Sequence, residues 1–161
     1  MNKTVMITGS FDPPTNGHIN LIERSSSLFS DVVVVIADNL KKNYLFSIEE
    51  RRCLLEECVK PFKNVRVDIT HTLVAEYARE HGINTIIRGV RNASDYSYET
   101  ELSLTNHMLN ESLDTVFLPA FEKYRGLSSS GVRELAHYGV DVSLFVPSVV
   151  KEALLKKKAQ I

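Results

Sequence analysis

The chain has 161 residues, of which 43% are hydrophobic and 24% charged, and its net charge is −1. This length fits one domain, and the near-neutral charge excludes the strong basic field typical of nucleic-acid-binding proteins. Cys53 and Cys58 lie five positions apart in an amphipathic segment, which favours reduced thiols over a disulfide framework or a zinc site. We find no signal peptide and no apolar run of the ~20 residues of a membrane span, so we expect a cytoplasmic protein without membrane partners.

Strand and helix patterns alternate along the chain. Mostly continuous apolar runs predict parallel strands, covered on both faces, at residues 4–8, 32–37, 65–69, 85–87 and 115–118. Helices are predicted at residues 17–29, 47–58, 73–81 and 95–110, after Ser128, and from Pro147 onward; the second opens on a Ser47–Glu50 capping box. We therefore expect a single α/β domain over residues 1–161, with a Rossmann-like, doubly wound, five-stranded parallel sheet of strand order 3-2-1-4-5.

The loop after the first strand has the pattern of a phosphate site. It reads Gly9-Ser10-Phe11-Asp12-Pro13-Pro14-Thr15-Asn16-Gly17-His18 and leads into a helix. A helix N-terminus attracts anions, Gly17 allows the backbone to approach a ligand, and His18 can give a hydrogen bond or a charge to a phosphate oxygen. For so short a motif, a tight turn with a surface histidine is the alternative.

Cations and hydroxyls follow three further strands. They lie in residues 38–43, which include Lys42, in Arg88-Gly89-Val90-Arg91, and in Ser128-Ser129-Ser130 at a helix start. The two arginines suggest a fork for phosphate, and the serines suggest either a helix cap or an anion nest. Because ligands bind beyond the carboxyl ends of parallel strands, these groups together predict a nucleotide and a second phosphorylated ligand.

Several other kinds of site are missing from the sequence. It contains no G-x-x-x-x-G-K-[ST], no G-x-G-x-x-G after the first strand, and no cluster with metal-ligand spacing. No Ser or Cys is clearly paired with a base, so the pattern indicates phosphate binding without a covalent intermediate. Glu99 either contacts a ribose or base, or faces Arg91 or another cation.

The loop 9–18 resembles the T/H-x-G-H signature of the nucleotidyltransferase superfamily. Residues 87–91, 95–99 and 128–130 resemble the corresponding motifs of bacterial phosphopantetheine adenylyltransferases. The resemblance implies transfer of the adenylyl group of ATP to 4′-phosphopantetheine, giving dephospho-coenzyme A and pyrophosphate in the penultimate step of coenzyme A synthesis. It also implies Mg²⁺ held mainly by the ATP phosphates, a homohexamer built as a dimer of trimers, and coenzyme A as a candidate feedback ligand.

The resemblance assigns roles to individual residues. His18 and Lys42 are the implied catalytic residues, with His18 stabilising the transition state. The implied phosphopantetheine ligands are Ser10, Lys42, Leu73, Val74 and Arg88. The implied ATP ligands are Ser10, Phe11, His18, Gly89, Val90, Arg91, Glu99, Tyr124, Arg125, Gly126, Leu127, Ser128, Ser129 and Ser130.

The chain departs from the family pattern at three places. Ser10 replaces the usual Thr, Arg125-Gly126-Leu127 replaces Ser-Phe-Ile/Val, and Ser103-Leu104-Thr105 replaces Ala-x-Met. Two alternatives remain open: adenylyl transfer to another phosphorylated acceptor, and a nucleotide-binding regulatory module without activity. Retention of His18, Lys42 and Arg88 together favours an enzyme.

Overall fold

The computed structural model describes residues 3–38, 43–126 and 128–158. Its sheet consists of parallel strands in the order β3-β2-β1-β4-β5, as predicted. The strands are β1 (Thr4–Gly9), β2 (Asp31–Ala37), β3 (Val65–Thr70), β4 (Thr85–Val90) and β5 (Asp114–Pro119). The helices are α1 (Asn16–Leu28), α2 (Ile48–Val59), α3 (Val74–Glu80), α4 (Ala93–Leu109), the 3-10 turn η1 (Glu122–Tyr124), α5 (Ser129–His137) and α6 (Ser148–Lys158).

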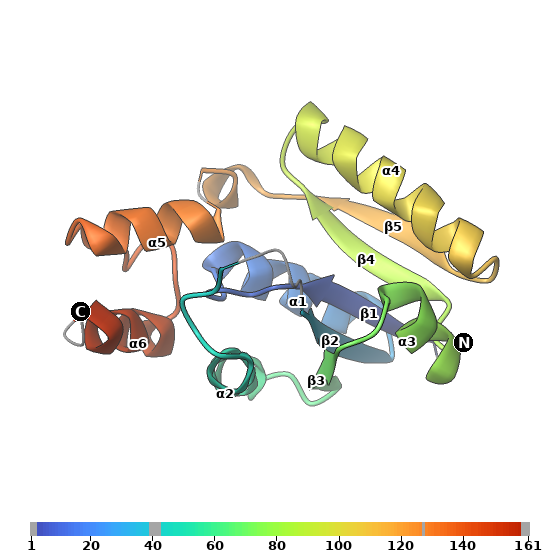
Figure 1. Ribbon diagram of the computed structural model, residues 1–161, viewed down its shortest axis with the longest axis horizontal. Coiled ribbons are helices and arrows are strands. Elements are labelled where there is room, and N and C mark those ends of the chain that lie inside the picture. Colours follow the sequence, from blue (N-terminus) through green and yellow to red (C-terminus); the bar gives the residue numbers. More distant parts are fainter. Residues whose placement is uncertain (1–2, 39–42, 127, 159–161) are drawn as a thin grey trace.

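Helices cover both faces of the sheet (Figure 1). On one face, Val5, Ile7 and alternate residues of β2 pack against Ile22 of α1 and Leu55 of α2. On the other, Met6 packs with α3. Residues 32–36 of β2 are fully buried, as expected for a central parallel strand, and the doubly wound fold class is confirmed.

A third apolar cluster lies beyond the carboxyl ends of the strands, where α5 and α6 run side by side (Figure 1). It joins Val132 of α5 and Val150 of α6 to Phe46 and to Leu54 of α2. None of the helices in the described ranges combines the length and apolar character of a membrane span.

The structure corrects the predicted end of β4. The strand continues three residues beyond Ile87, and Arg88, Gly89 and Val90 pair with Phe117, Leu118 and Pro119 of β5. The apolar pattern stops at Ile87, but ladder pairing with β5 keeps the chain extended. Arg88 therefore lies on a strand rather than in a loop. The Ser47–Glu50 capping box at the start of α2 is confirmed.

The buried face of α1 stabilises the helix that carries His18. Ile22 is fully buried in the core, whereas Leu28 on the same helix is 64% exposed. We expect Ile22→Ala to lower the free energy of unfolding by about 2–5 kcal/mol. Leu28→Ala, the matched control, should change it by less than about 0.5 kcal/mol. Urea denaturation of both variants measures this, and equal effects would contradict the packing described.

Candidate active site

A cleft of about 600 Å³ opens at the carboxyl ends of β1 and β4, the point at which the strand order reverses. Its walls include the end of β1 and the loop after it, α1, residues 43–44 after β2, the end of β4, α4, residues of the 118–124 segment and the start of α5. Most predicted site residues share this cleft, namely Ser10, Phe11, His18, Arg88, Gly89, Arg91, Glu99, Tyr124, Ser128, Ser129 and Ser130. The topology thus brings together residues that are more than 100 positions apart.

His18 is held by the residue that caps its helix. Thr15 is the N-cap of α1: its hydroxyl accepts the His18 backbone N–H at 3.3 Å, and its own backbone N–H donates to His18 Nδ1 at 3.0 Å. Because Nδ1 accepts a hydrogen bond, the neutral imidazole carries its proton on Nε2. The cap therefore selects the tautomer in which Nε2 can donate.

The environment of His18 favours the neutral ring. Burial in the cleft, followed by the positive charges of Arg88 and Arg91, lowers the pKa of His18 from 6.5 to about 4. His18 is therefore a neutral hydrogen-bond donor near pH 7 in the free protein. Of the two predicted modes, a hydrogen bond or a full charge, this environment favours the hydrogen bond.

The ring of Phe11 packs against the His18 ring. Its side chain is buried, and its ring meets the imidazole edge-on with centroids 5.0 Å apart. Phe11 has a φ of 49°, a left-handed conformation that is strained for a bulky residue. The contacts of the buried ring hold this conformation, which turns the chain from β1 toward α1.

Arg88 is fixed by partners on two elements. Its Nε donates to Glu99 of α4 at 2.7 Å, Nη2 donates to the second carboxylate oxygen, and Nη1 donates to the hydroxyl of Thr8 at 3.1 Å. Glu99 is only 8% exposed, and the ion pair with Arg88 balances its charge. Of the two predicted roles of Glu99, the structure shows the one in which it faces a cation, and that cation is Arg88. Contact of Glu99 with ATP stays a prediction.

Arg91 is paired with a different carboxylate. Its Nε and Nη2 donate to the two oxygens of Asp95 at 2.7 and 3.1 Å. These hydrogen bonds lower the pKa of Asp95 below its usual range. The two guanidiniums suggested as one fork are thus held separately, each on a carboxylate of α4.

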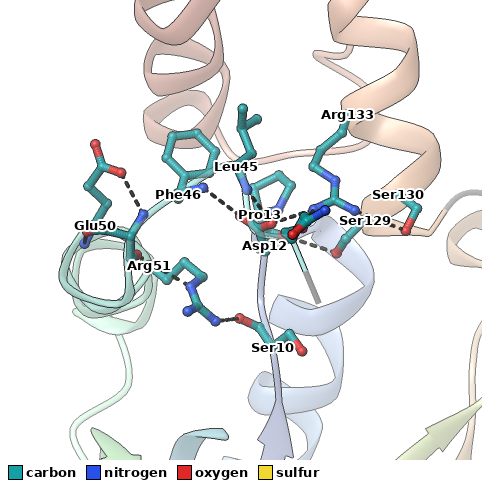
Figure 2. Close-up of polar contacts among 12 residues, drawn as sticks. Ser10, Asp12, Pro13, Leu45, Phe46, Glu50, Arg51, Ser129, Ser130 and Arg133 are labelled. Atoms are coloured by element: carbon teal, nitrogen blue, oxygen red, sulfur yellow. Dashed lines mark hydrogen bonds and ion pairs between the residues drawn. The ribbon is translucent and has the colours of Figure 1, made fainter. Parts of the chain in front are cut away.

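Among the residues of the cleft region to which the sequence analysis gave no role are Asp12, Arg51 and Arg133. Figure 2 shows Asp12 between the backbone of residues 45–46 and Arg133 of α5. In the same view, Arg51 of α2 donates to the Ser10 carbonyl; the donor–acceptor distance is 2.9 Å. Arg51 is almost fully buried, and its guanidinium lies over the Tyr44 ring, 3.8 Å from the centroid. The position of Arg133, four residues after Ser129 and so on one helix face with it, was a usable signal.

The remaining predicted residues lie elsewhere. Leu73 and Val74 line a second cavity of about 180 Å³, whose wall shares Thr8, Arg88 and Glu99 with the cleft. Within the described ranges, Val90, Arg125 and Gly126 do not line the cleft. Lys42 and Leu127 lie outside the described residues.

The cleft carboxylates are engaged by arginines. Asp12, Asp95 and Glu99 pair with Arg133, Arg91 and Arg88. In the part of the chain that the structure describes, no group of three His, Cys, Asp or Glu side chains could hold a metal ion. In the described cleft, these three carboxylates are therefore committed to ion pairs.

Comparisons with known proteins agree with this geometry. Residues 6–135 match the cytidylyltransferase-like family. Phosphopantetheine adenylyltransferases from Thermotoga neapolitana, Alkaliphilus metalliredigens and Finegoldia magna are 46%, 43% and 44% identical to the chain. Each alignment covers 92–98% of this chain and 92–99% of the relative.

A crystal structure of a proposed nicotinate-nucleotide adenylyltransferase from Vibrio parahaemolyticus has a TM-score of 0.72. It shares 19% identity, over 98% of this chain and 96% of that one, and so supports the fold.

Identity above 40% to the three adenylyltransferases, over nearly the whole length of each chain, shows the family. The chain belongs to the phosphopantetheine adenylyltransferases, within the cytidylyltransferase-like proteins.

Proposed function

We propose that this chain transfers the adenylyl group of ATP to 4′-phosphopantetheine, giving dephospho-coenzyme A and pyrophosphate. The observation that carries this proposal is the junction of two unlike cavities at Arg88. The larger one presents arginines, serines and a helix start, which suit phosphates. The smaller one is lined by Leu73, Val74, Leu102 and Leu109 among others, which suits an acceptor with a long, weakly polar arm.

The two substrates would meet over His18. ATP would lie toward Gly89, Arg91, Tyr124 and the start of α5. The acceptor phosphate would lie toward Ser10 and Arg88, and its arm would extend past Leu73 and Val74. Arg88 lines both cavities, which supports its assignment to the acceptor side. Lys42, which follows β2, stays a predicted ligand of the acceptor phosphate.

The reaction needs alignment more than proton transfer. An oxygen of the acceptor phosphate attacks the α-phosphorus of ATP, and the bond from that phosphorus to the bridging β-phosphate oxygen breaks. The attacking group is already an anion near pH 7, so no strong general base is required. Catalysis then consists of overcoming repulsion between anions and stabilising charge on the leaving pyrophosphate. The Nε2–H of His18, Arg91 and the helix N-termini would supply these contacts.

We expect Mg²⁺ to be held mainly by the ATP phosphates, where it would neutralise part of the developing charge.

A homohexamer is supported by exposed apolar side chains on α4, such as Leu104 (61%) and Met108 (83%), which a second copy would cover. A cytoplasmic location and coenzyme A as a feedback ligand are further proposals, supported by the family assignment.

The first test is acceptor specificity. With ATP and Mg²⁺, we expect rapid pyrophosphate release with 4′-phosphopantetheine and little with nicotinamide mononucleotide or glycerol 3-phosphate. The apolar side cavity is the physical reason, because the other two acceptors have no comparable arm to fill it. Equal or faster turnover with nicotinamide mononucleotide would contradict the proposal.

The second test removes the donor at the helix start. His18→Ala should lower kcat by about 10²–10³, since one preorganised donor to the transition state is lost. The KM values should change much less, because the contact strengthens in the transition state. His137→Ala, an exposed histidine on α5, is the matched control and should keep normal kcat. A kcat for His18→Ala within about threefold of the parent would exclude this role.

The third test concerns the charge of His18. Its pKa of about 4 predicts that the NMR resonances of this ring titrate well below pH 6.5 in the free protein. Between pH 6.5 and about 4 the unfolded chain binds a proton at His18 that the folded chain does not, so this residue lowers stability as pH falls through that window. His18→Gln should weaken the loss of stability in urea unfolding between pH 7 and pH 5. A ring that titrates near 6.5 would contradict the neutral assignment.

A further inference from the structure

The carboxylate of Asp12 joins two loops at the wall of the cleft. Asp12 lies in the loop after β1 and is 3% exposed. Its Oδ2 accepts the backbone N–H of Leu45 at 2.8 Å, and its Oδ1 accepts that of Phe46 at 2.9 Å. The segment that follows β2 is therefore connected to the loop that leads to His18.

Arg133 adds α5 to this connection. Its Nη1 donates to Oδ2 of Asp12 and, at 3.4 Å, to the carbonyl oxygen of Asn43; its Nη2 donates to the Ser130 hydroxyl at 3.4 Å (Figure 2). One guanidinium thus contacts both loops and the helix that begins with the serines of the cleft. Ser129 supports the same arrangement by donating to the Pro13 carbonyl at 2.8 Å.

Apolar packing attaches α5 without Arg133. The neighbouring residue, Val132, is fully buried in the cluster that contains Phe46, Val146 and Val150. Arg133 itself is 30% exposed and lines the cleft. Apolar contacts are non-directional, whereas hydrogen bonds to a planar guanidinium depend on angle. The polar contact is therefore suited to set the orientation of α5, while packing keeps it attached.

We propose that Arg133 is a positioning residue that, through Asp12, keeps the serines at the start of α5 aligned with the segment after β2. This inference rests on the proposed function, in which the start of α5 holds ATP and the loop after β1, to which Asp12 belongs, borders the acceptor phosphate. In-line transfer requires both ligands within a narrow geometry, and a displacement of about 1 Å can cost about 10²-fold in rate. Arg133 links the elements that set this geometry.

The test is a double-mutant cycle of Arg133→Met and Asp12→Asn. Each single variant should lower kcat by about 10- to 100-fold and leave both KM values within about threefold of the parent. The kcat of the double variant should lie within about twofold of the kcat of the less active single variant, because both substitutions remove the same connection. Arg133→Lys keeps the charge without the planar fork and should recover part of the lost kcat. If Arg133→Met does not fold, Arg133→Lys takes its place in the cycle, with a smaller loss expected.

Arg52→Met is the matched control, since it removes an exposed arginine–carboxylate pair with Glu56 on α2; its kcat should be unchanged. A loss confined to the KM for ATP in Arg133→Met would make Arg133 a direct nucleotide ligand and overturn the proposal. So would additive effects in the cycle, or a kcat that stays at the parent value.

A readout that needs no turnover separates this proposal from the proposed function. Hydrogen exchange of the Leu45 and Phe46 amides should be faster in Arg133→Met than in the parent or in Arg52→Met. Asp12 accepts from both amides, and without Arg133 its carboxylate is held less firmly in place. Unchanged exchange would overturn the positioning role even in an active enzyme. An inactive parent with faster exchange in the variant would instead contradict the proposed function alone.

Discussion

The cleft depends on one buried carboxylate. Asp12 lies where three segments distant in sequence converge, and it is bonded to backbone N–H groups of Leu45 and Phe46 and to Arg133. A carboxylate buried without such partners is costly, so the loop after β1, the segment after β2 and α5 are stable in this arrangement together rather than separately. Arg51 secures the same loop from the other side through the Ser10 carbonyl. The loop that leads to Thr15 and His18 is thus held between two arginines.

Charge balance explains how a cleft rich in arginine exists in a chain of net charge −1. Arg88 and Arg91 are each held by a carboxylate of α4, and Arg88 also donates through Nη1 to Thr8. A guanidinium has five N–H donors, so Arg91, whose side chain donates to Asp95, retains more of them than Arg88 does. Under the proposed function, the cations would therefore be oriented before a phosphate arrives, with donors left for it chiefly on Arg91. Burial, followed by the charges of these cations, keeps His18 neutral, which preserves the acceptor for the Thr15 N–H and leaves Nε2–H to donate. Preorganisation of this kind lowers the reorganisation needed during reaction.

Local signals predicted the sheet well. Runs such as the apolar core of β2, the Ser47–Glu50 capping box and the cluster of polar residues at strand ends follow from short-range chemistry, and the strand order is as expected. The end of β4 was placed too early because Arg88 and Gly89 interrupt the apolar pattern while pairing with β5 continues. Asp12 and Arg133 are 121 residues apart, and nothing in either neighbourhood specifies the other. The burial of Glu99 was likewise unpredictable, since it depends on Arg88 reaching it across two elements.

Arg88 lies where the cleft and the side cavity meet, so under the proposed function the arm of the acceptor and its phosphate would be bound by different parts of the protein. Arg88 lines both and is held rigidly by Glu99 and Thr8, so an acceptor phosphate at this position would be located by a fixed group rather than by its own arm. The departures Ser103 and Thr105 lie only in the side cavity. The Thr105 hydroxyl donates to the Glu101 carbonyl at 3.0 Å, so part of the added polarity is satisfied within α4. Under the proposed function, a change there would alter the fit of the acceptor arm while Arg88 and His18 keep their partners. Variation in the side cavity is therefore compatible with unchanged phosphate chemistry in the cleft.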